Sequence, residues 1–434
     1  MANNKERSLK WYELDNAAKI VPSTAHGSNT RVFRISCELK EEVDGKLLQA
    51  ALDEVIDEFP FFNCVLKKGL FWYYLEDCGI KPIVYEDNKP ACISIYFPGR
   101  KNLLYRVNYF GKRINLEMFH VLADGTGAFM FFKNLIAEYL VLAHDLEKVE
   151  IKDDISSVEE KNDDAFKQFY ERQKGLKQLK QMSSVKAYQL KGEKDENLLP
   201  HMVEGTVSSK KMVELAHEYQ TTVGILCVAI YIGACIDKMS VKEKKRPVCV
   251  SVPVNLRQFF PSDTARNFFG VINIKYYAKD YDGTLESIIT KVKDSFAEQL
   301  KPENVANTMN SYGALEHNLA IKIMPLFIKD LGIHFFDSLA KSGVTTSISN
   351  LGQIKMPPEL CPYIDKFSAF MTAPSQQICV SSFGEKMVFG EVSPYKTHEI
   401  MLSFFRRLTS MGVAVEVSTN DYDDVEEAKN EVLS

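Results

Sequence analysis

Residues 113–144 most constrain how this chain can fold, because a strand, a glycine-containing turn and a helix follow one another there without a break. The run RINLEMFH at 113–120 alternates as a strand does, and His120 lies on the same face as its apolar residues. The segment ADGTGA follows, and from 129 to about 144 apolar residues recur at helical spacing. A titratable imidazole at the inner end of a strand is either a buried structural group or a positioned base, and the local pattern leaves both readings open.

Strand and helix patterns follow one another along the rest of the chain. Alternation or short apolar runs between turn residues predict strands at 31–39, 61–66, 70–75, 92–96, 203–207, 247–254, 271–276, 345–352, 377–383, 386–392 and 412–417. Apolar stripes predict helices at 44–60, 165–182, 209–219, 222–236 and 284–299, another in the acidic tail from 420, and a helix or strand at 399–408. The run PVCVSVPV at 247–254 is apolar on both faces, which predicts a central strand.

The length of 434 residues predicts two domains. The segment 146–196 is highly charged and poor in large apolar residues, which is typical of a solvated crossover between two halves. We therefore expect a first domain at 1–185, which includes most of this linker, and a second domain at 197–434.

Charge and cysteine usage restrict the compartment and the partners. The net charge of −5, from 53 Lys and Arg against 58 Asp and Glu, gives no reason to expect a nucleic-acid partner. Nine scattered cysteines without a CxxC pair predict reduced core thiols in a cytoplasmic protein, and the N-terminus has no signal-peptide pattern. The longest uncharged stretch, at 221–236, is shorter than the ~20 residues that span a bilayer, so no membrane span is expected.

Several kinds of site lack their sequence signal. The chain contains no P-loop, no GxGxxG after a strand and no GxSxG elbow. His120 and Asp124 alone do not make a metal site, so no metal is predicted. The HxxxDG pattern formed by His120, Asp124 and Gly125 would arise by chance about 0.02 times in such a chain, which makes it a moderate signal.

The HxxxDG segment HVLADG at 120–125 resembles the signature of the chloramphenicol acetyltransferase-like superfamily of acyl-CoA-dependent acyltransferases and peptide-synthetase condensation domains. Three further segments follow in the order that this superfamily shows: VPVNLR at 252–257, RNFFG at 266–270 and SNLG at 349–352. Together with WYELDNAA at 11–18 and GLFWYYL at 69–75, they look most like bacterial alcohol-acetyltransferase-type members. The resemblance therefore covers nearly the whole chain.

This resemblance implies an α/β fold of two similar domains, each a mixed β-sheet with helices, that meet along a tunnel. His120 would be the catalytic general base, removing a proton from an alcohol or amine acceptor as that group attacks an acyl thioester, with no acyl-enzyme. Acyl-CoA would be the co-substrate, and no tightly bound cofactor is implied. A pKa of about 6.5 for an unperturbed imidazole suits this role near neutral pH.

The resemblance implies a structural role for the motif aspartate. Asp124 would turn away from the substrates and pair with an arginine, for which Arg257 is the candidate and Arg34 and Arg266 are rivals. The competing interpretation is a triad in which Asp124 orients His120.

Other site residues follow from the same resemblance. Gly125 would permit a tight backbone turn, or would be an ordinary turn glycine. Hydroxyl or amide groups near the end of a second-half strand are candidates for an oxyanion donor, namely Ser347, Ser349 and Asn350; each of them could instead be satisfying local backbone groups.

Some residues depart from particular branches of the superfamily. Phe119 stands where condensation domains usually carry a first histidine, no carrier-protein domain is attached, and SFGE at 382–385 is not the DFGWG of the plant acyltransferases. These departures favour a free-standing enzyme that uses a soluble thioester. A non-catalytic binding or scaffolding member of the same fold, and an acyltransferase that takes its acyl group from a carrier protein, remain as alternatives.

Overall fold

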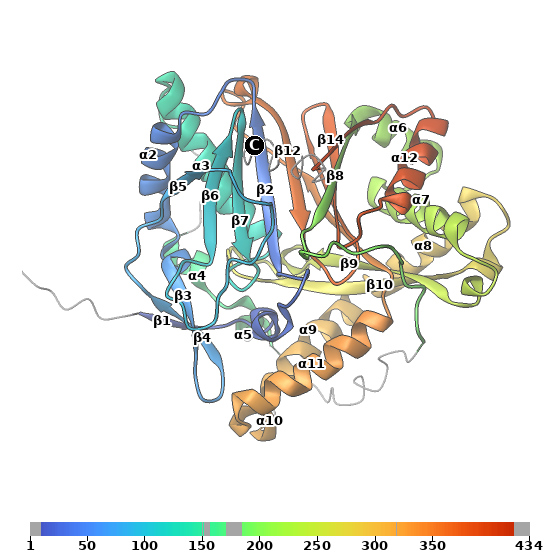
Figure 1. Ribbon diagram of the computed structural model, residues 1–434, viewed down its shortest axis with the longest axis horizontal. Helices are drawn as coiled ribbons and strands as arrows, with labels where there is room; N and C mark the ends of the chain where they lie inside the picture. The colour runs from blue at the N-terminus through green and yellow to red at the C-terminus, as the bar shows by residue number, and fades with distance from the viewer. Residues whose placement is uncertain (1–9, 150, 152–156, 171–184, 318, 421–434) are drawn as a thin grey trace, which may run out of the picture.

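The computed structural model describes residues 10–149, 151, 157–170, 185–317 and 319–420. Their strands form three sheets, and helices cover the outer faces of the two larger ones (Figure 1). The strands are β1 Trp11–Glu13, β2 Val32–Leu39, β3 Cys64–Lys68, β4 Tyr73–Asp77, β5 Val84–Glu86, β6 Tyr105–Phe110, β7 Arg113–Phe119, β8 His201–Ser208, β9 Pro247–Asn255, β10 Phe269–Tyr277, β11 Thr346–Gln353, β12 Ile364–Met371, β13 Gln377–Phe383, β14 Lys386–Ser393 and β15 Glu416–Thr419.

The described helices include the site helix α3, which follows β7. Their bounds are α1 Val21–Thr24, α2 Gly45–Val55, α3 Gly125–His144, α4 Val158–Asn162, α5 Ala165–Phe169, α6 Ser209–Glu218, α7 Val223–Lys238, α8 Leu285–Gln299, α9 Pro302–His317, α10 Leu319–Ile323, α11 Leu326–Ser342 and α12 Glu399–Ser410. The undecided segment 399–408 is thus helical. The helices between 302 and 342 and the strand β12 were not predicted from the sequence.

Each half of the chain is built on a mixed sheet. The first has the order β12-β2-β7-β6-β5, with α2 and α3 on its outer face, and a small sheet β1-β4-β3 accompanies it (Figure 1). The second has the order β10-β9-β11-β13-β14-β8-β15, with α6, α7, α8 and α12 on its outer face. The predicted α/β class of two mixed-sheet units with helices is confirmed, and β9 is a central strand as its composition predicted.

One strand does not follow the order of the chain. β12 comes from the second half of the sequence but pairs antiparallel with β2, with Phe367 opposite Cys37, so it is the edge of the first-half sheet. Its other neighbours are β13 and β14, and an added Cβ at Gly390 would lie 2.1 Å from the carbonyl oxygen of Ala369. The range 197–434, expected as one domain, therefore contributes a strand to the sheet of the other half.

Two other expectations about local structure were wrong. The segment 92–96 is not a strand, although the buried side chains of Cys92 and Ile95 account for its apolar pattern. The linker is not simply solvated, because Phe166 is 1% exposed and the backbone oxygen of Lys161 accepts from Ala265 N at 2.9 Å. The helix expected at 165–182 ends at Phe169, and its residues 171–182, like the tail from 421, lie outside the described residues.

The helix α3 is apolar because it is a core helix of the first half. Its 20 residues have the length and composition of a membrane span, but 56% of its most apolar window is buried inside the protein. Phe131, Phe132, Leu135 and Ile136 are fully buried there against the first-half sheet and α2. Burial of this kind explains the hydropathy without a bilayer.

Candidate active site

His120 lies directly after β7, where the strand turns toward α3. Its backbone N–H donates to the carbonyl oxygen of Arg31 at 3.0 Å, which continues the pairing with β2 beyond the end of the strand. The imidazole ring lies between two aromatic rings, with centroid distances of 5.3 Å to Phe33 and 5.6 Å to Phe269. Burial lowers the pKa of His120 below its usual 6.5, so the neutral ring prevails near neutral pH.

The His120 ring interacts with its own backbone carbonyl and with an amide from the other half of the chain. Asn267 Oδ1 lies 3.0 Å from His120 Nδ1, and Asn267 Nδ2 donates to Asp15 Oδ2 at 3.1 Å. Asn267 belongs to the segment that precedes β10, and Asp15 follows β1. Because Nδ1 is engaged, Nε2 is the ring nitrogen left for a substrate.

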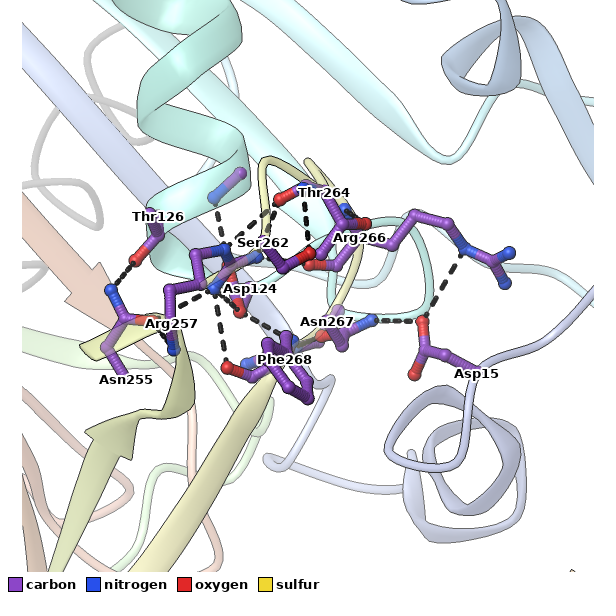
Figure 2. Close-up of polar contacts among 12 residues, drawn as sticks. Asp15, Asp124, Thr126, Asn255, Arg257, Ser262, Thr264, Arg266, Asn267 and Phe268 are labelled. Carbon is purple, nitrogen blue, oxygen red and sulfur yellow. Dashed lines mark hydrogen bonds and ion pairs between the residues drawn. The ribbon is translucent and has the colours of Figure 1, made fainter. Parts of the chain in front are cut away.

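Asp124 does not orient the imidazole. Its carboxylate caps α3 by accepting from Gly127 N at 2.9 Å, and it also accepts from Phe268 N at 2.8 Å. Arg257 completes the arrangement with Nη1–Oδ2 and Nη2–Oδ1 distances of 2.8 and 3.3 Å (Figure 2). The pairing expected between Asp124 and Arg257 is present, and both carboxylate oxygens are occupied by groups other than His120.

The two rival arginines have other partners. Arg34 on β2 donates to Glu117 at 2.9 Å and to Asp87 at 2.7 Å, within the buried polar face of the first-half sheet. Arg266 lies next to Asp15, with a distance of 3.9 Å from its Nε to Oδ2 of that residue (Figure 2). Their assignment as alternatives to Arg257 was therefore wrong.

Neither Gly125 of the motif nor Gly127, two residues later, has a positive φ, and space requires glycine only at Gly127. Gly125 is the first residue of α3 and does not have a positive φ, so the tight turn expected there was wrong. An added Cβ at Gly125 would lie 2.9 Å from Leu351 Cδ2, at the end of β11. At Gly127 the limit is severe, because a Cβ would lie 1.8 Å from the carbonyl oxygen of Ala265.

The three oxyanion candidates all lie on β11, but their environments differ. Ser347 and Ser349 are partly exposed and alternate with Ile348, which is buried in the core of the second half. The pairing of β11 shifts between Asn350 and Gly352, and Leu351 at this irregularity packs against the first-half core and contacts the start of α3. Asn350 is exposed, and its Oδ1 accepts from Gly352 N at 2.9 Å, which is the local backbone role that the alternative interpretation described.

Neither the cavities nor the metal-ligating residues that the structure describes provide a second candidate active site. Among the residues that the structure describes, no group of three or more His, Cys, Asp or Glu could hold a metal ion. A cavity of about 630 Å³ lies between the ends of β11 and β12 and the β13–β14 hairpin, lined among others by Lys355, Asp365 and Lys386. His120 is not among its lining residues, and the tunnel remains a prediction.

Sequence reasoning did not identify Asn267 and Asp15 as site residues. Both lie inside segments that carry the resemblance, RNFFG and WYELDNAA, which was the available signal. Their 252 residues of separation hid the contact, since only the packed halves bring them together.

The structure is an α/β fold of two mixed sheets, with His120 at the end of β7 in one sheet and its partner Asn267 beside β10 of the other. No family model and no curated protein sequence matches the chain. Solved structures do match. The trichothecene 15-O-acetyltransferase TRI3 from Fusarium sporotrichioides is 12% identical with a TM-score of 0.60, over 91% of this chain and 95% of that one.

Two other solved structures match over most of their length. TRI101 of F. sporotrichioides, complexed with coenzyme A and T-2, is 10% identical with a TM-score of 0.62, over 94% of this chain and 99% of that one. The first condensation domain of the calcium-dependent antibiotic synthetase is 12% identical with a TM-score of 0.60, also over 94% and 99%. At these identities the likeness shows the fold.

Proposed function

We propose that this protein is an acyltransferase that moves an acyl group from acyl-CoA to a small alcohol or amine in a ternary complex. The observation that carries the proposal is the state of His120: Nδ1 is engaged by Asn267, Nε2 is left for a substrate, and burial lowers the pKa of the ring. A neutral imidazole with one open nitrogen is what a general base requires.

The proposed step involves a single proton and one exchange of bonds. His120 Nε2 takes the proton of the acceptor hydroxyl or amine while that oxygen or nitrogen attacks the thioester carbonyl carbon. The resulting tetrahedral species collapses with cleavage of the carbon–sulfur bond, and the proton on His120 passes to the departing thiolate. General-base assistance of this kind contributes roughly 10²- to 10⁴-fold, and holding two substrates in line supplies more.

We propose Ser349 as the first candidate for the donor to the developing oxyanion. It lies on β11 two residues before Leu351, which packs against the first-half core and approaches Gly125 at the start of α3. Ser347 is one strand period further away, and the donor group of Asn350, Nδ2, faces the start of α7, where an added Cβ at Gly224 would lie 3.2 Å from it. A Ser349→Ala variant is expected to lower kcat with little change in stability, by analogy with the loss of other oxyanion donors.

The donor and acceptor classes are supported by what related folds bind. TRI101 of F. graminearum has been solved with coenzyme A and deoxynivalenol, and that of F. sporotrichioides with coenzyme A and T-2. A thioester donor and a small hydroxylated acceptor fit the proposed chemistry, and no tightly bound cofactor is needed. Because condensation and epimerization domains share the fold, a carrier-protein thioester is the second candidate donor.

The test follows thiol release from acetyl-CoA and longer acyl-CoAs with a panel of alcohols and amines. His120→Ala is expected to lower the rate by roughly 10²-fold or more. His144→Ala is the matched control, because His144 lies at the far end of α3 and stacks on Tyr363 at 3.8 Å. Equal rates for wild type and His120→Ala would reject the proposal and favour a non-catalytic binding protein, whereas turnover only with acyl carrier protein would select the second donor.

We also propose a reducing compartment such as the cytoplasm. All nine cysteines are free, and burial raises the pKa of most of them, as for Cys227, whose pKa is raised to about 12. Such thiols stay protonated and unreactive near neutral pH. Protein from cells lysed in a denaturing, alkylating buffer should carry nine alkylated cysteines by mass spectrometry, and fewer would contradict the proposal.

A further inference from the structure

We propose that Asp15 is a positioning residue that selects the tautomer of His120 by fixing the orientation of the Asn267 amide. The inference rests on the proposed function, because the tautomer matters only if Nε2 of His120 accepts a proton. It assigns a role to a buried carboxylate that is distinct from the motif residue Asp124.

The first step concerns the direction of the amide. Asp15 is 1% exposed; its Oδ1 accepts from Ala18 N at 2.8 Å and its Oδ2 accepts from Asn267 Nδ2 at 3.1 Å. An ionised carboxylate accepts hydrogen bonds and donates none. The amide of Asn267 therefore has to turn its NH₂ group toward Asp15, and this leaves its oxygen for the other side.

The second step concerns the imidazole. With Oδ1 of Asn267 directed at His120 Nδ1 at 3.0 Å, the ring nitrogen must be the donor, so the proton of the neutral ring is on Nδ1. The lone pair is then on Nε2, which is the form that can take a proton from an acceptor. The backbone carbonyl of His120 also favours a proton on Nδ1. Reversal of the amide would place its NH₂ group against Nδ1 and oppose that proton, and a ring that is protonated on Nε2 instead could not act as the base.

The backbone around Asn267 is held independently of this chain of contacts. Phe268 N donates to Asp124, and Arg266 donates through Nη2 to the carbonyl oxygen of Glu13. Asn267 itself is 1% exposed. A change at Asp15 should therefore alter the amide direction before it alters the position of the segment.

The charged groups that face Asp15 and His120 are few. Asp15 has Arg266 at 3.9 Å and also feels the carboxylate of Asp164 at the start of α5, while His120 feels Asp124 and Arg31. Burial raises the pKa of Asp15 to about 6, the largest effect among these. Protonated Asp15 can donate a hydrogen bond, so the orientation of the Asn267 amide becomes less constrained below about pH 6.

Substitution of Asp15 by Asn is the decisive change. The new amide has one oxygen where the carboxylate had two, and Ala18 N–H and Asn267 Nδ2 both require an acceptor. If the oxygen stays with Ala18, the NH₂ group faces Asn267 and favours reversal of its amide. Asn267→Asp is the second variant, because a carboxylate there still accepts from Nδ1 and should raise the pKa of His120, while one proton shared with Asp15 replaces the hydrogen bond that Asn267 Nδ2 donates at 3.1 Å.

The tautomer can be read directly from long-range ¹H–¹⁵N correlations of histidine-labelled protein at pH 8, with the His120→Ala spectrum as assignment. Wild type is expected to show Nδ1–H and Asp15→Asn to show Nε2–H. Glu391→Gln is the matched control, since Glu391 is a fully buried carboxylate whose partners are Gln376 and His398. It should leave the His120 signals unchanged.

Kinetics supply a second readout. Asp15→Asn is expected to lower kcat by roughly 10- to 100-fold at pH 8 with little change in KM, and Asn267→Asp to keep activity with its acid limb moved to higher pH. Nε2–H in wild type, or an unchanged tautomer in folded Asp15→Asn, would overturn the inference whether or not the enzyme turns over. If Asp15→Asn does not fold, the wild-type spectrum and Asn267→Asp decide. If the tautomers are as expected but wild type shows no His120-dependent turnover, the proposed function is rejected and the inference about the tautomer is not.

Discussion

Replacement of Asp124 by Asn is expected to destabilise the protein by about 3 to 5 kcal/mol, the usual cost of breaking a buried ion pair from one side. The carboxylate accepts from Gly127 N, Phe268 N and two nitrogens of Arg257. Each carboxylate oxygen accepts from one backbone N–H and one nitrogen of Arg257. A neutral amide has one oxygen, so it can keep the two donors of one oxygen and must lose the two of the other. Hydrogen bonds to charged groups are worth about 1.5 to 3 kcal/mol each, so the loss of two would cost about 3 to 6 kcal/mol, which overlaps the range for a broken ion pair.

Arg257 keeps partial compensation, which places the expected cost nearer the lower end. Its guanidinium also donates to the carbonyl oxygens of Thr264 at 2.9 Å and Arg266 at 2.7 Å. The assay is urea unfolding of wild type, Asp124→Asn, Arg257→Gln and the double variant, with acyl transfer measured alongside. We expect the double variant to lose less than the sum of the single losses, because both remove one interaction.

Glu193→Gln serves as the control for this experiment, since Glu193 pairs with Lys396 at an exposed position and should leave stability unchanged. Loss of acyl transfer by Asp124→Asn without loss of stability would refute the reasoning. That result would mean that the carboxylate acts on the chemistry, as a triad would require.

Three further outcomes follow from the same structure. Gly127→Ala should destabilise the protein by at least about 1 to 3 kcal/mol in urea unfolding, because its Cβ would lie 1.8 Å from the backbone of Ala265. Gly332→Ala, in open space on α11, should instead stabilise the protein by about 0.5 to 1 kcal/mol, and equal effects of the two variants would contradict the packing argument. The pKa of Asp15 is raised from 3.8 to about 6, so the native state holds a proton that the unfolded state releases. The stability of wild type relative to Asp15→Asn should therefore fall by about 2 kcal/mol as pH rises from 4 to 6.5, and parallel profiles would show that Asp15 titrates normally. Because burial lowers the pKa of His120, kcat/KM should rise through an acid limb below pH 6.5 to a plateau, and a limb above 7 would place another group in control.

The sequence predicted the local part of the site well. Alternation placed His120 at the end of a strand, and the same stretch predicted the apolar helix α3 behind it. Asp44 and Thr222 cap the helices expected after them, through Lys46 N and Ile225 N respectively. These features depend on neighbours within a few residues, so the chain itself carries the information.

What the sequence did not predict depends on distant contacts. The sequence of β12 shows only a weak strand pattern, and its partner, β2, lies more than 300 residues earlier in the chain. The polar face of β7 is buried although Glu117 is on it, because Arg34 and Arg106 supply opposite charge from neighbouring strands. Asn267 looked like one residue of a motif until the fold placed its amide against His120. Pairings of this kind need the arrangement of the sheets, which periodicity does not contain.

The proposed base depends on how firmly the two halves are joined, since its ring partner comes from the second half. Two links hold this geometry from different positions. At one, Arg257 and Phe268 of the second half bind Asp124 at the start of α3. At the other, Lys366 on β12 pairs with Glu204 on β8 at 2.5 Å and lies 3.6 Å from Glu38 on β2. A hinge between the halves would have to break both links, so the contact between His120 and Asn267 is preorganised rather than formed on binding.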